Sequence, residues 1–153
     1  PAMVSRARSL LAEECPAHSI DIIEGDIRRV EYRPASMIVL NFTLQFLSPG
    51  DRDAVMARLY EALEPGGVLV LSEKIVAADE QENAWLVERY HDFKRANGYS
   101  ELEISQKRTA LENVLVPDTL EAHHARLTRA GFGRATTWFQ YLNFASMIAF
   151  KEA

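Results

Sequence analysis

The sequence predicts an α/β domain built on a mostly parallel β-sheet. Apolar runs of the length of buried strands alternate with segments of helical periodicity, and the last two runs are rich in aromatic and β-branched residues. No repeat, low-complexity tract or linker interrupts the 153 residues, which suffice for one domain with an apolar core. Alternating strands and helices imply right-handed crossovers and parallel strands, to which an antiparallel strand is commonly added at an edge.

The first part of the chain is predicted to hold one helix and two strands. Residues 1–14 place apolar side chains on one side of a helix and arginines on the other. The run SIDIIEGDI, residues 19–27, is short and apolar and ends in Gly-Asp, which indicates a buried strand followed by a loop. The run ASMIVLNFTLQFL, residues 35–47, is apolar through Leu40, so we expect a strand that is buried on both faces.

The middle part is predicted to form a helix, a strand and two further helices. Ser48 is the expected N-cap of the first helix, with Pro49 at its first position, and Pro-Gly-Gly at 65–67 ends it before the strand VLVLSEKIV, residues 68–76. A helix over about 81–96 follows, and then another that starts at Ser100. Ser100 and Glu103 have the spacing of a capping box.

The last part is predicted to contain a helix and two strands. PDTLEAHHARLTRAGF, residues 117–132, has helical periodicity and is ended by Gly131. ATTWFQYLN (135–143) and FASMIAFKE (144–152) are predicted to pair as a hairpin at the end of the sheet.

Composition argues against several classes of function. The net charge of −5 disfavours stable binding to nucleic acid or anionic lipid, and no apolar run approaches the roughly 18 residues of a membrane span. Cys15 is the sole cysteine, which excludes an intrachain disulfide and a cysteine-based zinc site and is typical of the cytoplasm. His123 and His124 lack a matching carboxylate or cysteine cluster, so we predict no metal site.

Polar residues follow the predicted strands at the edge where ligands bind in open α/β sheets. Asp26 and Ile27 come after the run DIIE, where a carboxylate can accept a hydrogen bond from an exocyclic amine and an apolar side chain can cover an aromatic base. Asn41 follows MIVL and presents an amide that can both donate and accept. The alternatives are a turn or N-cap aspartate and an asparagine that satisfies a local turn.

Together, the ordered motifs G-D-I, V-L-N and L-x-P-G-G-x-L-x-x-x-E resemble the second half of the Rossmann-like class I fold of S-adenosylmethionine-dependent methyltransferases. The resemblance implies that Asp26 and Ile27 hold the adenine and that Asn41 lies near the methionine part. The stretches EGDIR, VLNFTLQFL, LSEK and HDFKRANGYSELEISQKR further resemble the carboxy-S-adenosyl-L-methionine synthase family.

That family resemblance implies a reaction other than methyl transfer. Prephenate loses its ring carboxyl group as carbon dioxide and becomes phenylpyruvate, and the deprotonated sulfonium methyl group of S-adenosyl-L-methionine captures the carbon dioxide. The product, carboxy-S-adenosyl-L-methionine, serves the modification of wobble uridine in tRNA. The alternatives are a methyltransferase that acts on a small molecule or on tRNA, and a truncated, non-catalytic association domain.

Such a site must hold an additional anion, and a guanidinium binds a carboxylate bidentately at any working pH. Arg108 matches the family's carboxylate-binding arginine and is the predicted catalytic and cofactor-binding residue. The alternative for Arg108 is a helix-surface pair with Glu112. Lys94 and Arg95 could attract an anionic substrate, although solvated helix charge is the favoured interpretation; Tyr99 could line the pocket or pack in the core, and His91 is left without a role.

The fold to which the chain is similar also needs a first strand that ends in an acidic, glycine-rich turn and a second that ends in an acid, and neither occurs here. We therefore expect residues 1–153 to be the C-terminal part of a single methyltransferase-like domain, with a helical insertion at about 79–113. Alone, this part is expected neither to fold stably nor to bind the cofactor tightly. The resemblance also implies a homodimer.

Overall fold

The computed structural model describes residues 1–15, 19–111 and 114–153, which form two compact units, Pro1–Glu31 and Tyr32–Ala153. The first unit contains helix α1 (Ala2–Glu14), as predicted, and irregular chain after it. The strand expected over 19–27 is absent from the described residues, and Ile20 and Ile23 are exposed. A strand is stable only when a neighbour satisfies its backbone groups, and no described ladder includes this run.

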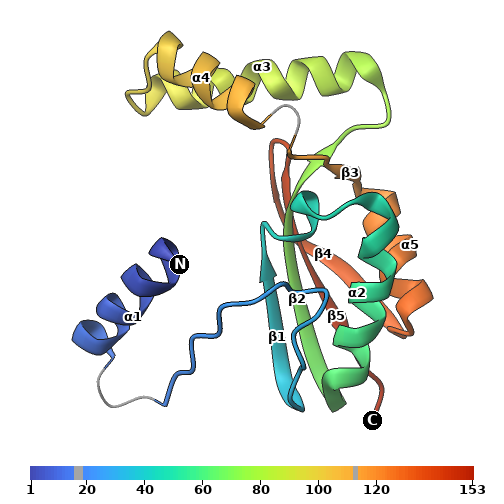
Figure 1. Cartoon of the computed structure of the whole chain (residues 1–153). Helices are drawn as coiled ribbons and strands as arrows, with labels where there is room; N and C mark the ends of the chain where they lie inside the picture. The colour runs from blue at the N-terminus through green and yellow to red at the C-terminus, as the bar shows by residue number, and fades with distance from the viewer. Residues whose placement is uncertain (16–18, 112–113) are drawn as a thin grey trace. The chain divides into compact units, whose positions relative to one another are not determined.

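The second unit is built on a sheet with the order β1-β2-β5-β4 (Figure 1). Its strands are β1 (Ala35–Asn41), β2 (Leu63–Val76), β4 (Arg134–Tyr141) and β5 (Phe144–Phe150), and a two-residue strand, β3 (Asp118–Thr119), pairs with the end of β2. Strand β2 is parallel to β1, and β5 is antiparallel to both β2 and β4. Strands β1, β2 and β4 therefore share one direction and β5 opposes them, which confirms the predicted fold class and the C-terminal hairpin.

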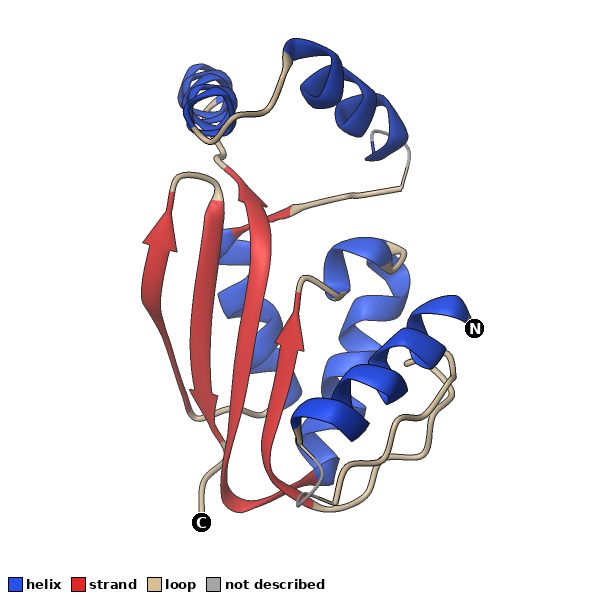
Figure 2. Ribbon diagram, turned by 90° about the vertical axis from the view of Figure 1, so that its left-hand side faces the viewer, coloured by secondary structure: helices blue, strands red, loops and turns tan. Residues whose placement is uncertain are grey.

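Helices α2 (Pro49–Ala62) and α5 (Leu120–Ala130) lie side by side against one face of this sheet (Figure 2). The core forms between them and the sheet from large apolar side chains that are almost fully buried: Val55, Met56, Leu59, Leu69, Leu71, Leu127 and Met147. On the other face, Met37 and Val39 of β1 are more than half exposed. The prediction that this strand is buried on both faces is therefore wrong, because the helices of the second unit cover only one side.

Strand β2 starts earlier than predicted, at Leu63 instead of Val68. Its register with β1 passes from Ala35 opposite Leu63 to Met37 opposite Val68, so that the segment 65–67 is accommodated in a bulge. Gly66 there has a φ of 76°, which favours glycine. The helix α2 therefore ends at Ala62, before the Pro-Gly-Gly segment that was expected to stop it, and that segment lies within β2.

Two further helices, α3 (Glu80–Ala96) and α4 (Glu101–Leu111), follow β2. The predicted capping box begins α4: the Ser100 N–H donates to Glu103 Oε2 at 2.8 Å, and the Glu103 N–H donates to Ser100 Oγ at 3.3 Å. Ser48 is the N-cap of α2, and Gly131, with a φ of 110°, ends α5, as the sequence predicts. The predicted signals at these three helix ends are found in position, although the Ser48 side chain makes no capping hydrogen bond to the backbone of α2.

Candidate functional site

A cavity of about 480 Å³ lies in the second unit, where the segments after the carboxyl ends of β1 and β2 meet α3 and α4. Phe42 and Phe46 come from the segment after β1, which includes a short 3₁₀ helix, η1 (Leu44–Phe46), and Lys74 comes from the end of β2. Tyr90 lies on α3 and Arg108 on α4. The cavity therefore occupies the place where open α/β sheets bind their ligands.

Among the described residues that line the cavity, all four of the fully charged side chains are basic: Lys74, Lys94, Lys107 and Arg108. Lys94 is only 9% exposed. Within the part of the chain that the structure describes, no carboxylate forms an ion pair with any of the four. Lys74 is half-buried, whereas Lys107 and Arg108 are exposed on the wall of the cavity. Four cations that gather at one cavity repel one another, and an anionic ligand would relieve that repulsion.

Aromatic rings lie beside these cations. The Nζ atoms of Lys94 and Lys74 are 4.4 and 5.8 Å from the centre of the Tyr90 ring. Phe144 packs edge-on against both Tyr90 and Phe42, with ring centres 5.0 and 5.8 Å apart. The cavity thus combines positive charge with an aromatic wall that can contact an unsaturated ring.

The pKa values of three basic side chains that line the cavity are lowered. Burial lowers the pKa of Lys74, and burial together with the charges of Lys107 and Lys74 lowers the pKa of Lys94. Burial and four nearby cations, among them Arg108, also lower the pKa of His91. The cavity therefore disfavours additional positive charge and favours a negative ligand.

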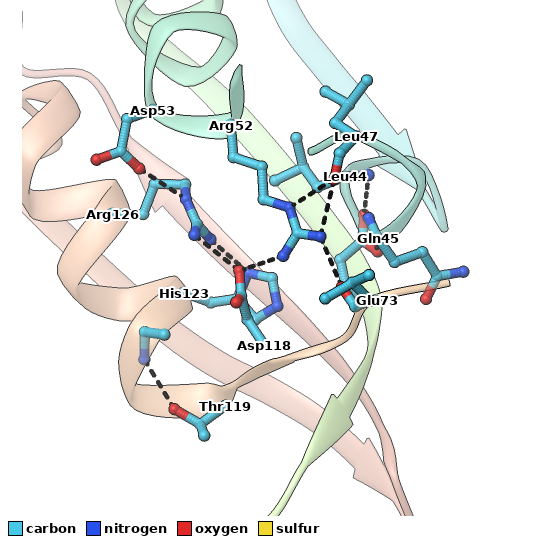
Figure 3. Close-up of polar contacts among 12 residues, drawn as sticks. Leu44, Gln45, Leu47, Arg52, Asp53, Glu73, Asp118, Thr119, His123 and Arg126 are labelled. Atoms are coloured by element: carbon cyan, nitrogen blue, oxygen red, sulfur yellow. Dashed lines mark hydrogen bonds and ion pairs between the residues drawn. The ribbon is translucent and has the colours of Figure 1, made fainter. Parts of the chain in front are cut away.

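The segment after β1 is held in place by the fully buried carboxylate of Glu73 (Figure 3). Glu73 Oε1 accepts the backbone N–H groups of Thr43 at 2.9 Å and Leu44 at 2.8 Å, and Oε2 accepts that of Gln45 at 3.2 Å. Burial raises the pKa of Glu73, and these three hydrogen bonds oppose that shift. Because Phe42, Gln45 and Phe46 line the cavity, the hydrogen bonds of Glu73 to this segment fix the position of one cavity wall.

A second buried group, Arg52 of α2, joins that wall to the segment before β3 (Figure 3). Its Nε and Nη2 donate to the Leu47 carbonyl at 3.1 and 2.9 Å, and Nη2 also donates to the Val116 carbonyl at 2.6 Å. Its Nη1 is 2.7 Å from Asp118 Oδ2, which also accepts from Arg126 at 2.7 Å. Arg52 therefore fixes two segments that are far apart in the sequence but adjacent at the cavity.

His123 of α5 completes this network (Figure 3). Its Nδ1 is 3.3 Å from Nη1 of Arg126, and the side chain is 2% exposed. Burial, reinforced by the charge of Arg126, lowers the pKa of His123 to about 4. The imidazole is therefore neutral at physiological pH.

The structure places Arg108, the first predicted site residue, on the wall of the cavity. Its alternative partner, Glu112, lies outside the described residues. The expectation that Lys94 is a solvated helix charge is wrong, because Lys94 is buried and lines the cavity. The same expectation holds for Arg95, which is exposed and pairs with Asp92 and Glu101.

His91 of α3 and Tyr99, which follows that helix, were also considered from the sequence, and only His91 lines the cavity. His91, to which the sequence assigned no role, lines the cavity. Tyr99 is 45% exposed and is not one of the described residues that line the cavity, so neither pocket lining nor core packing fits it.

The residues predicted to hold S-adenosyl-L-methionine lie in both units. Asn41 is exposed at the end of β1, next to Phe42 of the cavity wall. Asp26, in the first unit, is paired with Arg28: Oδ1 accepts the Arg28 backbone N–H at 2.9 Å, and Oδ2 lies 2.6 Å from Nη2. Hydrogen bonds from the side chain and backbone of Arg28 lower the pKa of Asp26 to about 2. Ile27 is half-buried beside it.

Sequence reasoning missed Lys74 and Arg52 as residues that build the site, and it placed Glu73 in a motif without giving it a role. A lysine and a glutamate within the apolar run VLVLSEKIV were the available signal, because such residues enter a buried strand only with a specific partner or ligand. Arg52 gave no signal, because the sequence DRD suggests surface charge.

Within 1–15, 19–111 and 114–153, no three His, Cys, Asp or Glu side chains are grouped so as to hold a metal ion. The helices described there are too short or too polar to cross a membrane. Cys15 is a free, half-buried thiol.

The profile of the O-methyltransferase domain matches residues 1–93, and the chain belongs to this family. Solved structures agree on the fold: the methyltransferase SibL in its apo form is 16% identical with a TM-score of 0.67 over all of this chain and 42% of its own. PigF with SAH is 18% identical with a TM-score of 0.65 over all of this chain and 41% of its own. The predicted class I methyltransferase fold is thereby confirmed.

More specifically, the chain is similar to curated proteins named carboxy-S-adenosyl-L-methionine synthase, which confirms the resemblance found in the sequence. It is 80% identical to the protein from Chromohalobacter salexigens over all 153 residues, which are 57% of that relative. It is 61% identical to the protein from a Psychrobacter species over 99% of this chain and 55% of the relative. The chain therefore spans little more than half the length of these relatives.

Proposed function

We propose that the protein makes carboxy-S-adenosyl-L-methionine from S-adenosyl-L-methionine and prephenate, releasing phenylpyruvate. The observation that carries this proposal is the cavity in which Lys74, Lys94, Lys107 and Arg108 meet without a described counterion. Methyl transfer to a neutral acceptor requires no such charge, whereas carboxyl transfer brings anions into the site. The names of the relatives that are up to 80% identical support the same reaction.

In the proposed reaction, prephenate breaks the bond between its ring and its ring carboxyl group. The bonding electrons aromatise the ring and expel the ring hydroxyl group as hydroxide, which takes one proton from the sulfonium methyl group and leaves as water. The released carbon dioxide forms a new carbon–carbon bond to that methyl carbon. The donor, having lost carbon dioxide and hydroxide, is phenylpyruvate.

In this proposal, Arg108 binds the carboxyl group during and after its transfer through two parallel hydrogen bonds. S-adenosyl-L-methionine, when bound, supplies the methyl carbon that accepts the carboxyl group. Asn41 is suited to contact its methionine part, because its amide is exposed at the carboxyl end of β1. Asp26 fits an adenine amine only if it shares its oxygens with Arg28, since both oxygens already accept from that residue.

The test is mass spectrometry of the nucleoside products after incubation of the full-length protein with S-adenosyl-L-methionine and prephenate. We expect a species heavier by one carbon dioxide that requires prephenate. Arg108→Ala is expected to lower its rate of formation roughly 10- to 150-fold, the value of one charge-assisted contact. Arg95→Ala is the matched control, because Arg95 is an exposed arginine paired with surface acids, and it should retain the activity.

Other outcomes would redirect the assignment. A methylated acceptor, with Arg108→Ala as active as wild type, would replace the proposal with methyl transfer. Bound but unconverted S-adenosyl-L-methionine would indicate a binding or association role.

The wider setting of the proposed reaction rests on the sequence resemblance. We propose a homodimeric, cytoplasmic enzyme whose product serves tRNA wobble-uridine modification, without stable binding of tRNA by this chain. The net charge of −5 supports the last part, because phosphate contacts need clustered cations on an open surface. Light scattering of the full-length protein tests the dimer, and filter binding tests the affinity for tRNA.

A further inference from the structure

We propose that Lys74 and Lys94, beside the ring of Tyr90, form a second anion subsite that binds the carboxylate which the donor keeps after the transfer. The inference rests on the proposed function, because it concerns the same cavity and the same donor. It assigns to these lysines a role in substrate specificity, distinct from that of Arg108.

The first argument is the burial of Lys94. This side chain is 9% exposed and lines the cavity, and no described carboxylate forms an ion pair with it. Its Nζ instead lies over the Tyr90 ring, 4.4 Å from the ring centre. A cation–π contact offsets only part of the desolvation penalty that accompanies a buried ammonium group. The aromatic ring alone therefore does not explain a buried lysine here.

The second argument is the number of cations. Arg108 suffices for one carboxylate, because its guanidinium fork binds both oxygens. Lys74 then remains at the end of β2, its Nζ 5.8 Å from the same Tyr90 ring that Lys94 contacts. Prephenate carries two carboxylates, of which one is transferred and one remains. A pair of lysines around one ring provides a separate place for the carboxylate that remains.

The third argument is the apolar surface next to the lysines. Tyr90 packs against Phe144, and Phe144 against Phe42, with ring centres 5.0 and 5.8 Å apart. All three rings line the cavity. A ligand that joins a six-membered unsaturated ring to a short carboxylate arm matches this arrangement of rings and ammonium groups.

A structural role for Lys94 makes the opposite prediction from a binding role. Lys94→Met keeps most of the side-chain stem and removes the charge. If Lys94 serves packing through Tyr90, Lys94→Met should lower the thermal unfolding midpoint of the full-length protein. If Lys94 serves an anion, the ligand-free variant should be as stable as wild type or more stable, because a buried charge without a counterion is gone.

The decisive experiment measures the dissociation constant of phenylpyruvate by titration calorimetry in low-salt chloride buffer, with the full-length protein. Phenylpyruvate carries the retained carboxylate and lacks the transferred one. Lys94→Met and Lys74→Met should each weaken its binding roughly tenfold, as expected for loss of a charge-assisted contact. Arg95→Met, which removes an exposed charge one residue away, should stay within about twofold of wild type.

Kinetics with prephenate separate the two anion sites. Lys94→Met should raise KM with little change in kcat, whereas Arg108→Met should lower kcat. Equal effects of Lys94→Met and Arg95→Met on phenylpyruvate binding, or no binding of phenylpyruvate to wild type, would overturn the second subsite while leaving the carboxylation assay intact. Conversely, lysine-dependent phenylpyruvate binding without a carboxylated product would keep the subsite and remove the proposed function.

Discussion

Replacing Arg52 by methionine should destabilise the second unit more than any surface charge change in the same network. Arg52 is fully buried and donates to the carbonyls of Leu47 and Val116 while it pairs with Asp118. Methionine keeps the stem of the side chain and removes every donor. The change therefore isolates the polar contribution of one guanidinium.

The magnitude follows from what each partner loses. Asp118 keeps Arg126, whose Nη2 lies 2.7 Å from Oδ2, so its charge stays paired. The carbonyls of Leu47 and Val116 lose their Arg52 hydrogen bonds, at a cost of about 1–3 kcal/mol for each one left unsatisfied. Relief of the arginine's own desolvation offsets part of this cost. A net loss of about 3–5 kcal/mol matches the usual effect of removing one member of a buried pair.

The assay is urea unfolding of the full-length protein, followed by circular dichroism. Arg129→Met is the matched control: Arg129 is an exposed arginine that pairs with Asp53 in the same network, and its loss should change the free energy of unfolding by about 0–1 kcal/mol. Phenylpyruvate binding to Arg52→Met should weaken as well, because the segments that Arg52 joins line the cavity. If Arg52→Met and Arg129→Met cost the same, the reasoning from burial is refuted.

Two further changes test other parts of the second unit. The pKa of His123 is lowered from 6.5 to about 4 in the folded chain, so the unfolded chain takes up a proton at a higher pH. The contribution of the neutral imidazole to the free energy of unfolding is therefore fully present above pH 6.5, and about 3 kcal/mol of it is lost as the pH falls to 4. His123→Gln should flatten that part of the curve of unfolding free energy against pH, and an unchanged curve would contradict the neutral imidazole. Gly131→Ala should cost at least about 1 kcal/mol, measured by the denaturation midpoint, because φ is 110° and the new Cβ would lie 2.9 Å from the Tyr60 ring; Gly50→Ala, with open space around it, is the control.

Local signals in the sequence were sufficient where a single segment determines the outcome. The Ser100–Glu103 capping box and the glycine at 131 depend on residues within one turn, and both are found as predicted. The run 19–27 shows the limit of such signals. Its apolar residues are compatible with a strand, but a strand also needs a neighbour, and the sequence of the run contains no information about that neighbour.

In the candidate site, too, some residues could be found from local sequence and others could not. Arg108 could be found through its resemblance to a family motif, and it does line the cavity. Lys94 and Arg95 are consecutive and both basic, yet Lys94 is buried beside the Tyr90 ring and Arg95 is exposed, because successive helix positions point about 100° apart. Arg52 acquires its role from Val116 and Asp118, more than sixty residues away. Long-range packing of this kind is not encoded in any local pattern.

The lysines beside Tyr90, and Arg108 on the wall of the same cavity, have no described carboxylate as a partner, and they also link the stability of this protein to the ions in its surroundings. Any small anion that enters the cavity binds the folded chain in preference to the unfolded one. Sulfate or phosphate at a hundred times its dissociation constant would add about 2.7 kcal/mol of stability. The melting temperature of this protein should therefore depend on the choice of buffer anion as well as on ionic strength, so that a simple thermal scan across salts reports on the cavity before any substrate is added.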